Sequence, residues 1–505
     1  MNNKKIVNLK GLINLRKKNK KKKIVLVHGV FDIIHKGHLE YFKEAKKYGD
    51  ILVASVTDDQ YVNKGFNRPY YSSINRIRFL SELEVIDYVV LSKNKSAVEI
   101  IKSLRPNFYV KGPDYLLKKN DKAGNLDIEK KMVIKNGGKI AFSSGLLMSS
   151  TKIINENFNE FNVIQKFLKQ NNKNFLDKNK MIKEFELCEN KIKKQKILII
   201  GEIILDNYLY SSPLGTPSKE NILSVNYIKK VEYLGGSIPI LNNFSELYND
   251  ITFLSFYENK KFANKIKRNF SNKVKIDLIY ENQFKEIKKN RYIDINNNRK
   301  FFEYYDFNNK EFNNLKLLNY LKSNIKKFDK VVVCDFGHGL INDEVIKILE
   351  EKSKFLCINV QTNSGNRGFN LFSKFQKADL LVLDEPELRL GLSARYKPLN
   401  KIIYSTKLRK FKNIMITLGV NGLALKLFRE KKFIFFPALA SNVVDTIGAG
   451  DAAFSYCSML VGNTRNNTLI GFFCSIAGAI KTRILGHSNF IKIDEVKRSF
   501  ESLIK

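Results

Sequence analysis

Short apolar runs alternate with helically spaced apolar residues through the first third of the chain. Most of the runs are rich in valine and isoleucine, and they cover residues 24–27, 51–56, 88–91, 108–111 and 139–142. The helical spacing covers residues 39–47, 74–83 and 96–104. Strands that alternate with helices predict a parallel sheet with helices on both faces.

The same alternation resumes near residue 196 with the run KILIIG. Further apolar runs cover residues 251–255, 331–334, 355–360, 380–383 and 414–417. The sequence therefore predicts a second α/β domain, and the expected fold class is two doubly wound α/β domains. In such folds ligands bind at the carboxyl ends of the strands, so the loops that follow the apolar runs are the places to look for chemistry.

Three segments depart from this alternation. Residues 1–23 predict a basic N-terminal tail, and the charged stretch at 116–136 predicts a loop or lid. Residues 156–195 are rich in Lys, Asn and Glu, with apolar residues at helical spacing, which predicts a linker of one or two helices. The expected domains are therefore residues 24–155 and 196–505.

Composition narrows the class of protein. A chain of 505 residues suggests two or three domains, and no apolar run approaches the ~18 residues that span a bilayer. The five cysteines show no CxxC spacing, which argues against structural zinc or a disulfide framework. We therefore expect a cytoplasmic protein without a membrane span.

The net charge of +38 attracts anions in general, including nucleic acids, membranes, nucleotides and sugar phosphates. The lysines are spread over the whole chain, and only residues 16–23 form a dense basic run. We therefore expect no specific nucleic-acid partner. A basic nucleic-acid or membrane-surface binder that uses the N-terminus stays open as an alternative.

The first chemical motif is GVFDIIHKGH at residues 29–38, which directly follows a buried-type run. Three of the five histidines fall within eleven residues here. His35 and His38 are one helical turn apart at a helix start, so both rings can point to one face beside free backbone N–H groups. Such a place favours phosphate, and imidazoles can stabilise charge on a phosphoryl group. A surface accident or half of a metal site is the alternative.

This motif resembles the HxGH signature of the nucleotidyltransferase superfamily. The resemblance continues through residues 67–69, 75–76, 110–115 and 149–154, and it covers most of the first 155 residues. It implies a Rossmann-like domain in which His35 and His38 stabilise the transition state. It implies nucleotide or phosphate contacts at Gly29, Phe31, Asp32, Arg76, Lys111, Ser149, Ser150 and Thr151. For Arg76 and Lys111 taken singly, a solvated surface cation is an equal alternative.

The second chemical motif is DTIGAGD at residues 445–451. Gly448, Ala449 and Gly450 leave backbone N–H groups bare at the start of a helix expected at 451–460, which makes an anion hole for a transferred phosphoryl group. Asp451 at its mouth can accept the proton of an acceptor hydroxyl. A tight turn with a helix-capping aspartate is the alternative.

DTIGAGD resembles the signature of the ribokinase-like PfkB carbohydrate kinases, and this resemblance covers residues 196–505. It implies a ribokinase-like α/β sandwich. Four further elements of that family have counterparts here. They are the turn after the first strand at 201–206, the sugar-binding glycine pair at 235–236, a turn with the sequence DFGHG at 335–339 and the nucleotide loop around 417–422. It implies sugar contacts at Asp206, Gly235 and Gly236, nucleotide or phosphate contacts at Thr417, Gly419, Gly422, Gly448, Ala449 and Gly450, and magnesium held through water by Asp384 and Glu387.

Two departures concern recognition of the sugar. Pro239 stands where the family has a sugar-binding asparagine, and proline has no side-chain donor. Residues 359–361 are Asn-Val-Gln, where heptose kinases have DPK. The resemblance therefore leaves the identity of the sugar open.

Together the two halves resemble bifunctional heptose-phosphate kinase/adenylyltransferases with the domain order reversed. This resemblance implies a sugar kinase and a nucleotidyltransferase that together make a nucleotide-activated sugar for surface glycans. It also implies Mg²⁺ and ATP, with CTP possible at the N-terminal site. A catalytically silent, sugar- or nucleotide-sensing C-terminal half is the alternative, and a homo-oligomer stays open.

Overall fold

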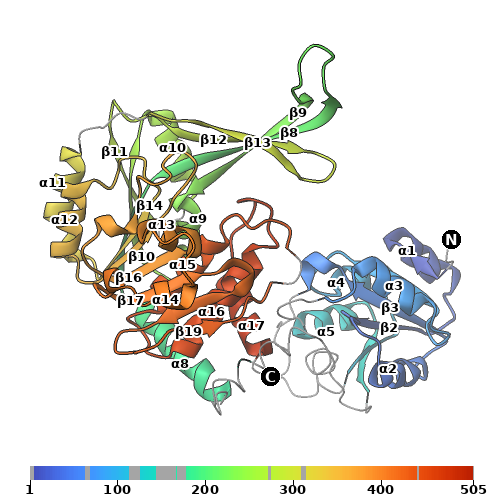
Figure 1. Cartoon of the computed structure of the whole chain (residues 1–505). Coiled ribbons are helices and arrows are strands. Elements are labelled where there is room, and N and C mark those ends of the chain that lie inside the picture. Colours follow the sequence, from blue (N-terminus) through green and yellow to red (C-terminus); the bar gives the residue numbers. More distant parts are fainter. Residues whose placement is uncertain are drawn as a thin grey trace. The chain divides into compact units, whose positions relative to one another are not determined.

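The structure is a computed structural model that describes residues 5–62, 69–112, 126–143, 167, 178–270, 274–308, 314–440 and 443–503. The chain divides into two compact units, residues 1–162 together with Lys505, and residues 163–504 (Figure 1).

The N-terminal unit contains a six-stranded parallel sheet in the order β1-β4-β3-β2-β5-β6. Its strands are β1 (Ile6–Val7), β2 (Ile24–Gly29), β3 (Ile51–Thr57), β4 (Tyr88–Ser92), β5 (Phe108–Lys111) and β6 (Lys139–Phe142). Its helices are α1 (Leu9–Lys18), α2 (Lys36–Lys46), α3 (Ser73–Ser81), α4 (Val98–Leu104) and α5 (Leu126–Lys135). The five predicted strands and three predicted helices are confirmed.

Two apolar cores cover the two faces of this sheet. Because successive side chains of a strand point to opposite faces, Val25 of β2 packs into one core with α2 and α3, and Leu26 packs into the other with α1, α4 and α5. This two-sided burial explains why the strands appear in the sequence as continuous apolar runs.

Two expectations about this unit are wrong. The expected basic tail contains β1 and α1, because Leu12 and Leu15 are buried against the sheet while Lys10, Lys17 and Lys18 of the same helix are exposed. Part of the expected loop at 116–136 is the helix α5, whose residues Leu126, Glu129 and Val133 are buried. In both places an apolar stripe was hidden by the surrounding charges.

The C-terminal unit contains a nine-stranded sheet in the order β11-β10-β7-β14-β15-β16-β17-β18-β19. Only β18 and β19 run antiparallel to their neighbours. The strands are β7 (Lys196–Gly201), β10 (Asp250–Tyr257), β11 (Val274–Tyr280), β14 (Lys330–Asp335), β15 (Leu356–Val360), β16 (Ala378–Asp384), β17 (Phe411–Thr417), β18 (Leu423–Lys426) and β19 (Ile434–Phe436). The six predicted strands are confirmed.

The helices of this unit include the predicted helix after the DTIGAGD motif, which begins two residues earlier than expected. They are α8 (Lys178–Ile192), α9 (Ser237–Ser245), α10 (Lys260–Arg268), α11 (Leu315–Asn324), α12 (Asp343–Lys352), α13 (Glu385–Gly391), α14 (Leu399–Ile402), α15 (Ala449–Leu460), α16 (Asn467–Lys481) and α17 (Ile493–Leu503).

A buried lysine caps the C-terminal end of α15. The Lys330 ammonium donates to the carbonyl oxygens of Ser458 and Val461, the latter at 2.9 Å.

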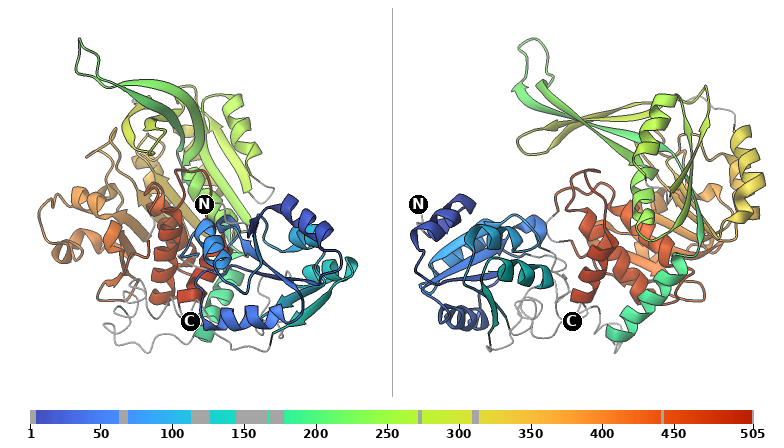
Figure 2. Two further views of the ribbon diagram at one scale, coloured as in Figure 1. Left: turned by 90° about the vertical axis from the view of Figure 1, so that its right-hand side faces the viewer. Right: turned by 180° about the vertical axis from the view of Figure 1, so that it is seen from behind.

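A second, four-stranded sheet in the order β13-β12-β8-β9 extends from the α/β body of the same unit (Figure 2). Its strands are β8 (Ile203–Gly215), β9 (Ser224–Gly236), β12 (Ile287–Asp294) and β13 (Lys300–Asp306). Only Glu202 separates β7 of the large sheet from β8. The sequence analysis did not predict this sheet, because its strands mix charged and apolar residues.

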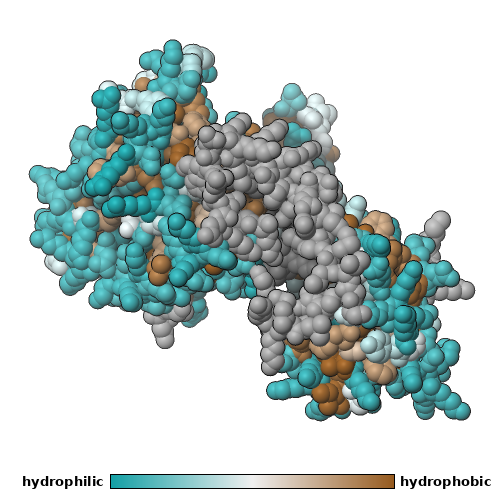
Figure 3. Space-filling view, turned by 90° about the horizontal axis from the view of Figure 1, so that it is seen from below, coloured by the Kyte–Doolittle hydropathy of each residue, from teal (hydrophilic) through white to brown (hydrophobic). Residues whose placement is uncertain are grey.

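Hydrophilic residues predominate on the face shown in Figure 3, and hydrophobic ones form small separate patches. Among the helices that the structure describes, none has the length and apolar content needed to cross a membrane.

Helix α8 lies in the segment expected to be a linker, yet it packs within the C-terminal unit. The ring of Phe185 stacks on Phe473 at 4.5 Å between centroids. The Glu184 carboxylate accepts hydrogen bonds from Thr464 Oγ1 at 2.5 Å and Asn466 Nδ2 at 2.8 Å. The expected boundary at residue 196 therefore falls too late.

We predict that a fragment of residues 178–505 is more stable than one of residues 196–505. Loss of α8 exposes apolar surface around Phe473, and a loss of about 2 kcal/mol lowers the thermal midpoint of a fragment of this size by about 3 °C. Differential scanning calorimetry measures the difference. Within the longer fragment, Phe185→Ala should lower the midpoint and the control Leu187→Ala, at a 57% exposed side chain, should not. Equal midpoints for the two fragments would restore the linker interpretation.

Candidate active sites

The loop that follows β2 is shaped by a glycine and a phenylalanine. A Cβ atom on Gly29 would lie 3.0 Å from Phe31 Cζ, so the ring can fold back only against a glycine. Phe31 has φ of 50°, in the left-handed region that non-glycine residues seldom adopt. Its buried ring packs edge-on against His38 at 5.6 Å and Phe42 at 5.1 Å between centroids.

The two motif histidines lie together at the start of α2. Their rings stack at 3.9 Å between centroids with 24° between planes. The backbone N–H groups of His38 and Leu39 donate to the His35 carbonyl oxygen at 2.8 Å and 3.2 Å, which begins the helix. The expected placement of both rings on one face is confirmed, and their part in stabilising a transition state stays a prediction.

Asp32 and Arg76 hold the surrounding loops. Buried Asp32 accepts backbone hydrogen bonds from Tyr70 at 2.8 Å and Tyr71 at 3.0 Å. Both residues were predicted to contact nucleotide or phosphate, and no ligand tests that prediction.

The Arg76 side chain is fully buried and joins several segments. Its guanidinium donates to the carbonyl oxygens of Val30 at 2.5 Å, Thr57 at 2.9 Å and Tyr71 at 2.9 Å, and it pairs with Asp59 at 2.6 Å. Burial excludes the solvated-cation alternative. The structure thus gives Arg76 an architectural position beneath the loop.

Lys111, at the end of β5, forms a buried ion pair that the sequence analysis did not foresee. Its Nζ lies 2.8 Å from Glu129 Oε2 on α5. Glu129 also accepts from the Ala97 N–H at 2.8 Å and the Tyr109 hydroxyl at 2.9 Å. Burial alone would raise the pKa of Glu129, but the Lys111 charge and the Ala97 hydrogen bond hold it below its usual range. The solvated alternative for Lys111 is excluded, and its phosphate contact stays a prediction.

The remaining predicted residues of this site, Ser149, Ser150 and Thr151, lie outside the described residues, as do residues 67–68 and 113–115 of the resembling stretches.

We predict that Glu129→Gln destabilises the N-terminal unit by about 3–5 kcal/mol, because it leaves the buried Lys111 ammonium without its carboxylate. Urea denaturation followed by a probe in this unit measures the loss. Glu40→Gln is the matched control, since Glu40 pairs with the 73% exposed Lys36 at 3.9 Å and such pairs contribute little. A loss no larger than that of the control would show that the buried pair carries no stability.

In the C-terminal unit, the start of α15 is formed by small residues, as the motif predicts, but the Ala449 N–H is not bare, because it donates to the Thr446 carbonyl oxygen at 3.3 Å. Gly448 precedes the helix at φ of 79°, and a Cβ there would lie 2.9 Å from Lys481 Cε and 3.3 Å from His487 Cε1. No neighbouring atom lies within 4 Å of the Cβ position of Gly450. The first N–H groups of a helix have no intrahelical partner, so this end can hold an anion.

The Asp451 carboxylate lies in the first turn of α15 and is oriented by Gln361. Gln361 Nε2 donates to Asp451 Oδ1 at 2.5 Å and also lies 2.9 Å from Asn359 Oδ1. Burial raises the pKa of Asp451, and the neighbouring His487 and Gln361 offset only part of that effect. A raised pKa suits a general base, because it brings proton affinity closer to the working pH. The sequence analysis noted residues 359–361 only as a departure and missed this contact.

Asp206, expected to bind sugar, lies under the glycine pair. A Cβ on Gly235 would lie 2.2 Å from Asp206 Oδ2, so this close approach requires a glycine. The buried carboxylate pairs with the Arg291 guanidinium and with His487 Nε2 at 3.2 Å. Burial alone would raise the pKa of Asp206, but His487 and Arg291 hold it below its usual range. A direct contact of Asp206 or Gly236 with sugar stays a prediction.

Asp384 and Glu387, expected to hold magnesium through water, form a capping box at the start of α13. The Glu387 N–H donates to Asp384 Oδ1 at 2.7 Å, and the Asp384 N–H donates to Glu387 Oε2 at 2.9 Å. Glu387 Oε1 accepts from the Thr362 N–H at 3.0 Å. Burial and the Asp384 charge raise the pKa of Glu387 to about 8. The part of both carboxylates in holding magnesium through water stays a prediction.

No group of three or more metal-ligating side chains occurs among the described residues. Magnesium commonly binds one or two carboxylates together with substrate phosphates, so it would enter here as part of Mg·ATP.

The predicted nucleotide loop follows β17. Gly419 has φ of 56° and Gly422 has φ of 88°, and a Cβ on Gly422 would lie 2.0 Å from the Phe436 carbonyl oxygen. The Leu418 N–H donates to the Gly422 carbonyl oxygen at 2.8 Å, which closes the turn. Thr417 ends β17 at the carboxyl edge of the sheet, and its contact with nucleotide stays a prediction.

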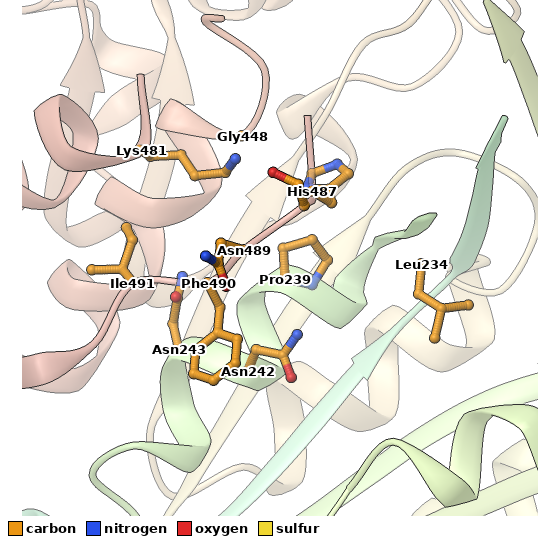
Figure 4. A pocket seen from close by; sticks show the side chains of 11 residues that line it. Leu234, Pro239, Asn242, Asn243, Gly448, Lys481, His487, Asn489, Phe490 and Ile491 are labelled. Carbon is orange, nitrogen blue, oxygen red and sulfur yellow. The ribbon is translucent and has the colours of Figure 1, made fainter. Parts of the chain in front are cut away.

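A pocket of about 180 Å³ lies beside the start of α15 (Figure 4). It is lined by Leu234, Pro239, Asn242, Asn243, Gly448, Lys481, His487, Ser488, Asn489, Phe490 and Ile491. The pocket therefore joins the position of the altered sugar-binding residue, Pro239, to the predicted anion hole at Gly448. His487 and Lys481 were not predicted, because they follow the motif by about thirty residues or more without a pattern of their own.

Two family models match the chain. A model described as cytidylyltransferase-like matches residues 26–156, and a model described as pfkB family carbohydrate kinase matches residues 194–455, just over half of the chain.

The chain is also similar to curated proteins named bifunctional protein HldE. The protein from Helicobacter hepaticus is 42% identical over 113 residues, which is 22% of this chain and 23% of that protein. The protein from Geobacter metallireducens is 41% identical over 115 residues, 22% of this chain and 24% of that protein. The chain thus spans about a quarter of the length of these relatives.

Among solved structures, a ribokinase from Thermotoga maritima is 15% identical with a TM-score of 0.48, covering 61% of this chain and 99% of that one. Phosphofructokinase-2 from Escherichia coli, in its tetrameric inhibited form, is 13% identical with a TM-score of 0.47, covering 62% of this chain and 100% of that one.

Proposed function

The chain belongs to the pfkB family of carbohydrate kinases, and on that premise we propose that its C-terminal unit transfers the γ-phosphoryl group of Mg·ATP to a hydroxyl of a sugar or sugar phosphate. The observation that carries this proposal is the half-buried Asp451 carboxylate at the start of α15, whose Oδ2 lies 3.8 Å from the Cβ position of Gly448 in the pocket wall. A hydroxyl in that pocket can approach both the carboxylate and the helix amides.

The residues present suit this reaction. Asp451 takes the proton of the acceptor hydroxyl as the new oxygen–phosphorus bond forms and the bond to the leaving ADP breaks. The N–H groups at Gly448 and Gly450 hold the phosphoryl oxygens and favour the charge that builds on them. The Ala449 N–H, which donates to the Thr446 carbonyl oxygen at 3.3 Å, would have to exchange that partner to join them. Gln361 keeps the carboxylate in one orientation through its 2.5 Å hydrogen bond.

For the N-terminal unit we propose transfer of a nucleotidyl group from ATP or CTP to a sugar phosphate. An oxygen of the sugar phosphate attacks the α-phosphorus, and the bond to the β-phosphate breaks to release pyrophosphate. The stacked His35 and His38 rings at the start of α2 are placed to stabilise the negative charge on the oxygens of that phosphoryl group. The cytidylyltransferase-like match supports this step.

Two phosphate-handling units on one chain are best explained if the product of one is the substrate of the other. We therefore propose that the kinase makes a sugar 1-phosphate from a heptose 7-phosphate or similar sugar, and that the N-terminal unit activates it. The product is a nucleotide-activated sugar of the kind used for surface glycans, made in the cytoplasm where ATP is available.

Mass spectrometry of the products tests this proposal. The whole chain is incubated with a panel of sugar phosphates, each with ATP or CTP and magnesium. A phosphorylated sugar followed by a nucleotide sugar supports both steps. Nucleotidyl transfer to an unrelated phosphate ester, with no transfer to the kinase product, would show two separate activities.

We predict that His38→Ala lowers nucleotidyl transfer by about 10²–10³-fold, because it removes a preorganised group at the reacting phosphorus. Sugar phosphorylation by the same variant should continue, which serves as the control for folding. Transfer within a few-fold of the unmodified chain would remove the histidines from the mechanism.

We predict that Asp451→Asn lowers sugar phosphorylation by at least about 10²-fold, since asparagine keeps the shape of the side chain and loses the proton acceptor. Calorimetric titration should show that ATP still binds, and nucleotidyl transfer to an added sugar 1-phosphate should be unchanged. Normal phosphorylation by this variant would exclude Asp451 as the base.

A sensing role for the C-terminal unit is the second candidate. It is favoured by Pro239 in the pocket and by the engagement of Asp206 with Arg291 and His487. Under this candidate a sugar phosphate binds to the chain, yet no sugar in the panel is phosphorylated.

A further inference from the structure

The pocket beside α15 needs a polar partner for a sugar, and Pro239 cannot supply a side-chain one. Two other polar groups at its wall are already engaged. Asn243 Nδ2 donates to Ser455 Oγ at 3.2 Å, and the Lys481 ammonium donates to the Gly486 carbonyl oxygen. Recognition of a polyhydroxylated ligand therefore draws on other groups of the lining, which include Asn242, Ser488, Asn489 and His487.

His487 is held in the pocket wall in one orientation. Its side chain is 7% exposed, and its Nε2 lies 3.2 Å from Asp206 Oδ2, which is itself fixed by Arg291. The Cδ2 atom lies 3.4 Å from the Cβ position of Gly235, and Cε1 lies 3.3 Å from that of Gly448. The ring is thus wedged between the glycine pair and the start of α15, and Figure 4 shows it between Pro239 and Gly448.

The second ring nitrogen, Nδ1, is buried and has no hydrogen-bond partner among the described residues. Because the ionised Asp206 carboxylate can only accept, Nε2 carries a proton and donates it. In the neutral ring Nδ1 is then an acceptor. A buried acceptor without a partner is unfavourable, so this nitrogen marks a place where a ligand donor fits.

We propose that His487 Nδ1 accepts a hydrogen bond from a hydroxyl of the phosphoryl acceptor, and that it supplies the side-chain hydrogen bond that Pro239 cannot make. This inference rests on the proposed kinase function and assigns the pocket to the acceptor sugar. The volume of about 180 Å³ is below the ~300–1,000 Å³ of typical small-molecule sites. It therefore suits part of a monosaccharide and not a nucleoside triphosphate.

Two substitutions, each made in the whole chain, distinguish a direct hydrogen bond between His487 and the sugar from a role of His487 that only positions Asp206. His487→Gln can still donate an N–H to Asp206 but has no acceptor at the Nδ1 place. His487→Asn retains a polar atom near Nδ1 and is too short to reach Asp206. We expect the KM for heptose 7-phosphate to rise by about tenfold in His487→Gln. His487→Asn should stay within about threefold of the unmodified chain, and the KM for ATP should not change in either variant.

The opposite order, with His487→Gln normal and His487→Asn impaired, would overturn the proposal and leave His487 as a support for Asp206. If both variants lose affinity, monodeoxy analogues of the sugar decide. The unmodified chain should bind one analogue about tenfold more weakly than the parent, and His487→Gln should bind the two alike. Equal losses in both proteins for every analogue would also overturn it.

The contact between His487 and the sugar can also be tested if the kinase proposal fails. If the unmodified chain phosphorylates no sugar in the panel, calorimetric titration with heptose 7-phosphate still compares binding to it and to His487→Gln. A weaker titration of the variant supports the contact without catalysis, and equal titrations, or no binding to either protein, reject it.

Discussion

The C-terminal site depends on the absence of a side chain at Gly448. This residue adopts a left-handed backbone at φ of 79°, directly against the side chains of Lys481 and His487. A Cβ there would crowd both side chains and disturb the contact between His487 Nε2 and Asp206. One backbone position thus places the helix amides, the pocket wall and the Asp206 network relative to one another.

The N-terminal site also depends on a glycine that leaves room for a neighbouring side chain. Buried charged residues hold the segments around that glycine in place. Gly29 lets Phe31 fold back beneath His38, while Arg76 and the Lys111–Glu129 pair fix the segments around the loop. Charged side chains are expensive to bury unless they are paired. Here the cations expected to meet phosphate are satisfied by the protein itself, which makes the loop geometry independent of ligand.

The sequence predicted those parts of the molecule whose signals are local. Apolar runs located the parallel strands, and compact motifs located both helix starts, because each pattern lies within about ten residues. It could not predict partners distant along the chain, such as Gln361 with Asp451, Glu129 with Lys111, or His487 with Asp206. It also missed the four-stranded sheet, since strands that face water on one side carry charges and lack a continuous apolar run.

The buried Lys330 ammonium at the far end of α15 has a consequence for how this unit can respond to substrate. It joins strand β14 of the central sheet to the last carbonyl groups of the helix, so that the C-terminal end of α15 is anchored. A dipole held in this way needs little reorganisation energy when charge develops at its other end. Adaptation to different sugars would then require movement of the four-stranded sheet and the pocket wall, while the dipole of the helix that faces the phosphoryl group keeps its position and orientation.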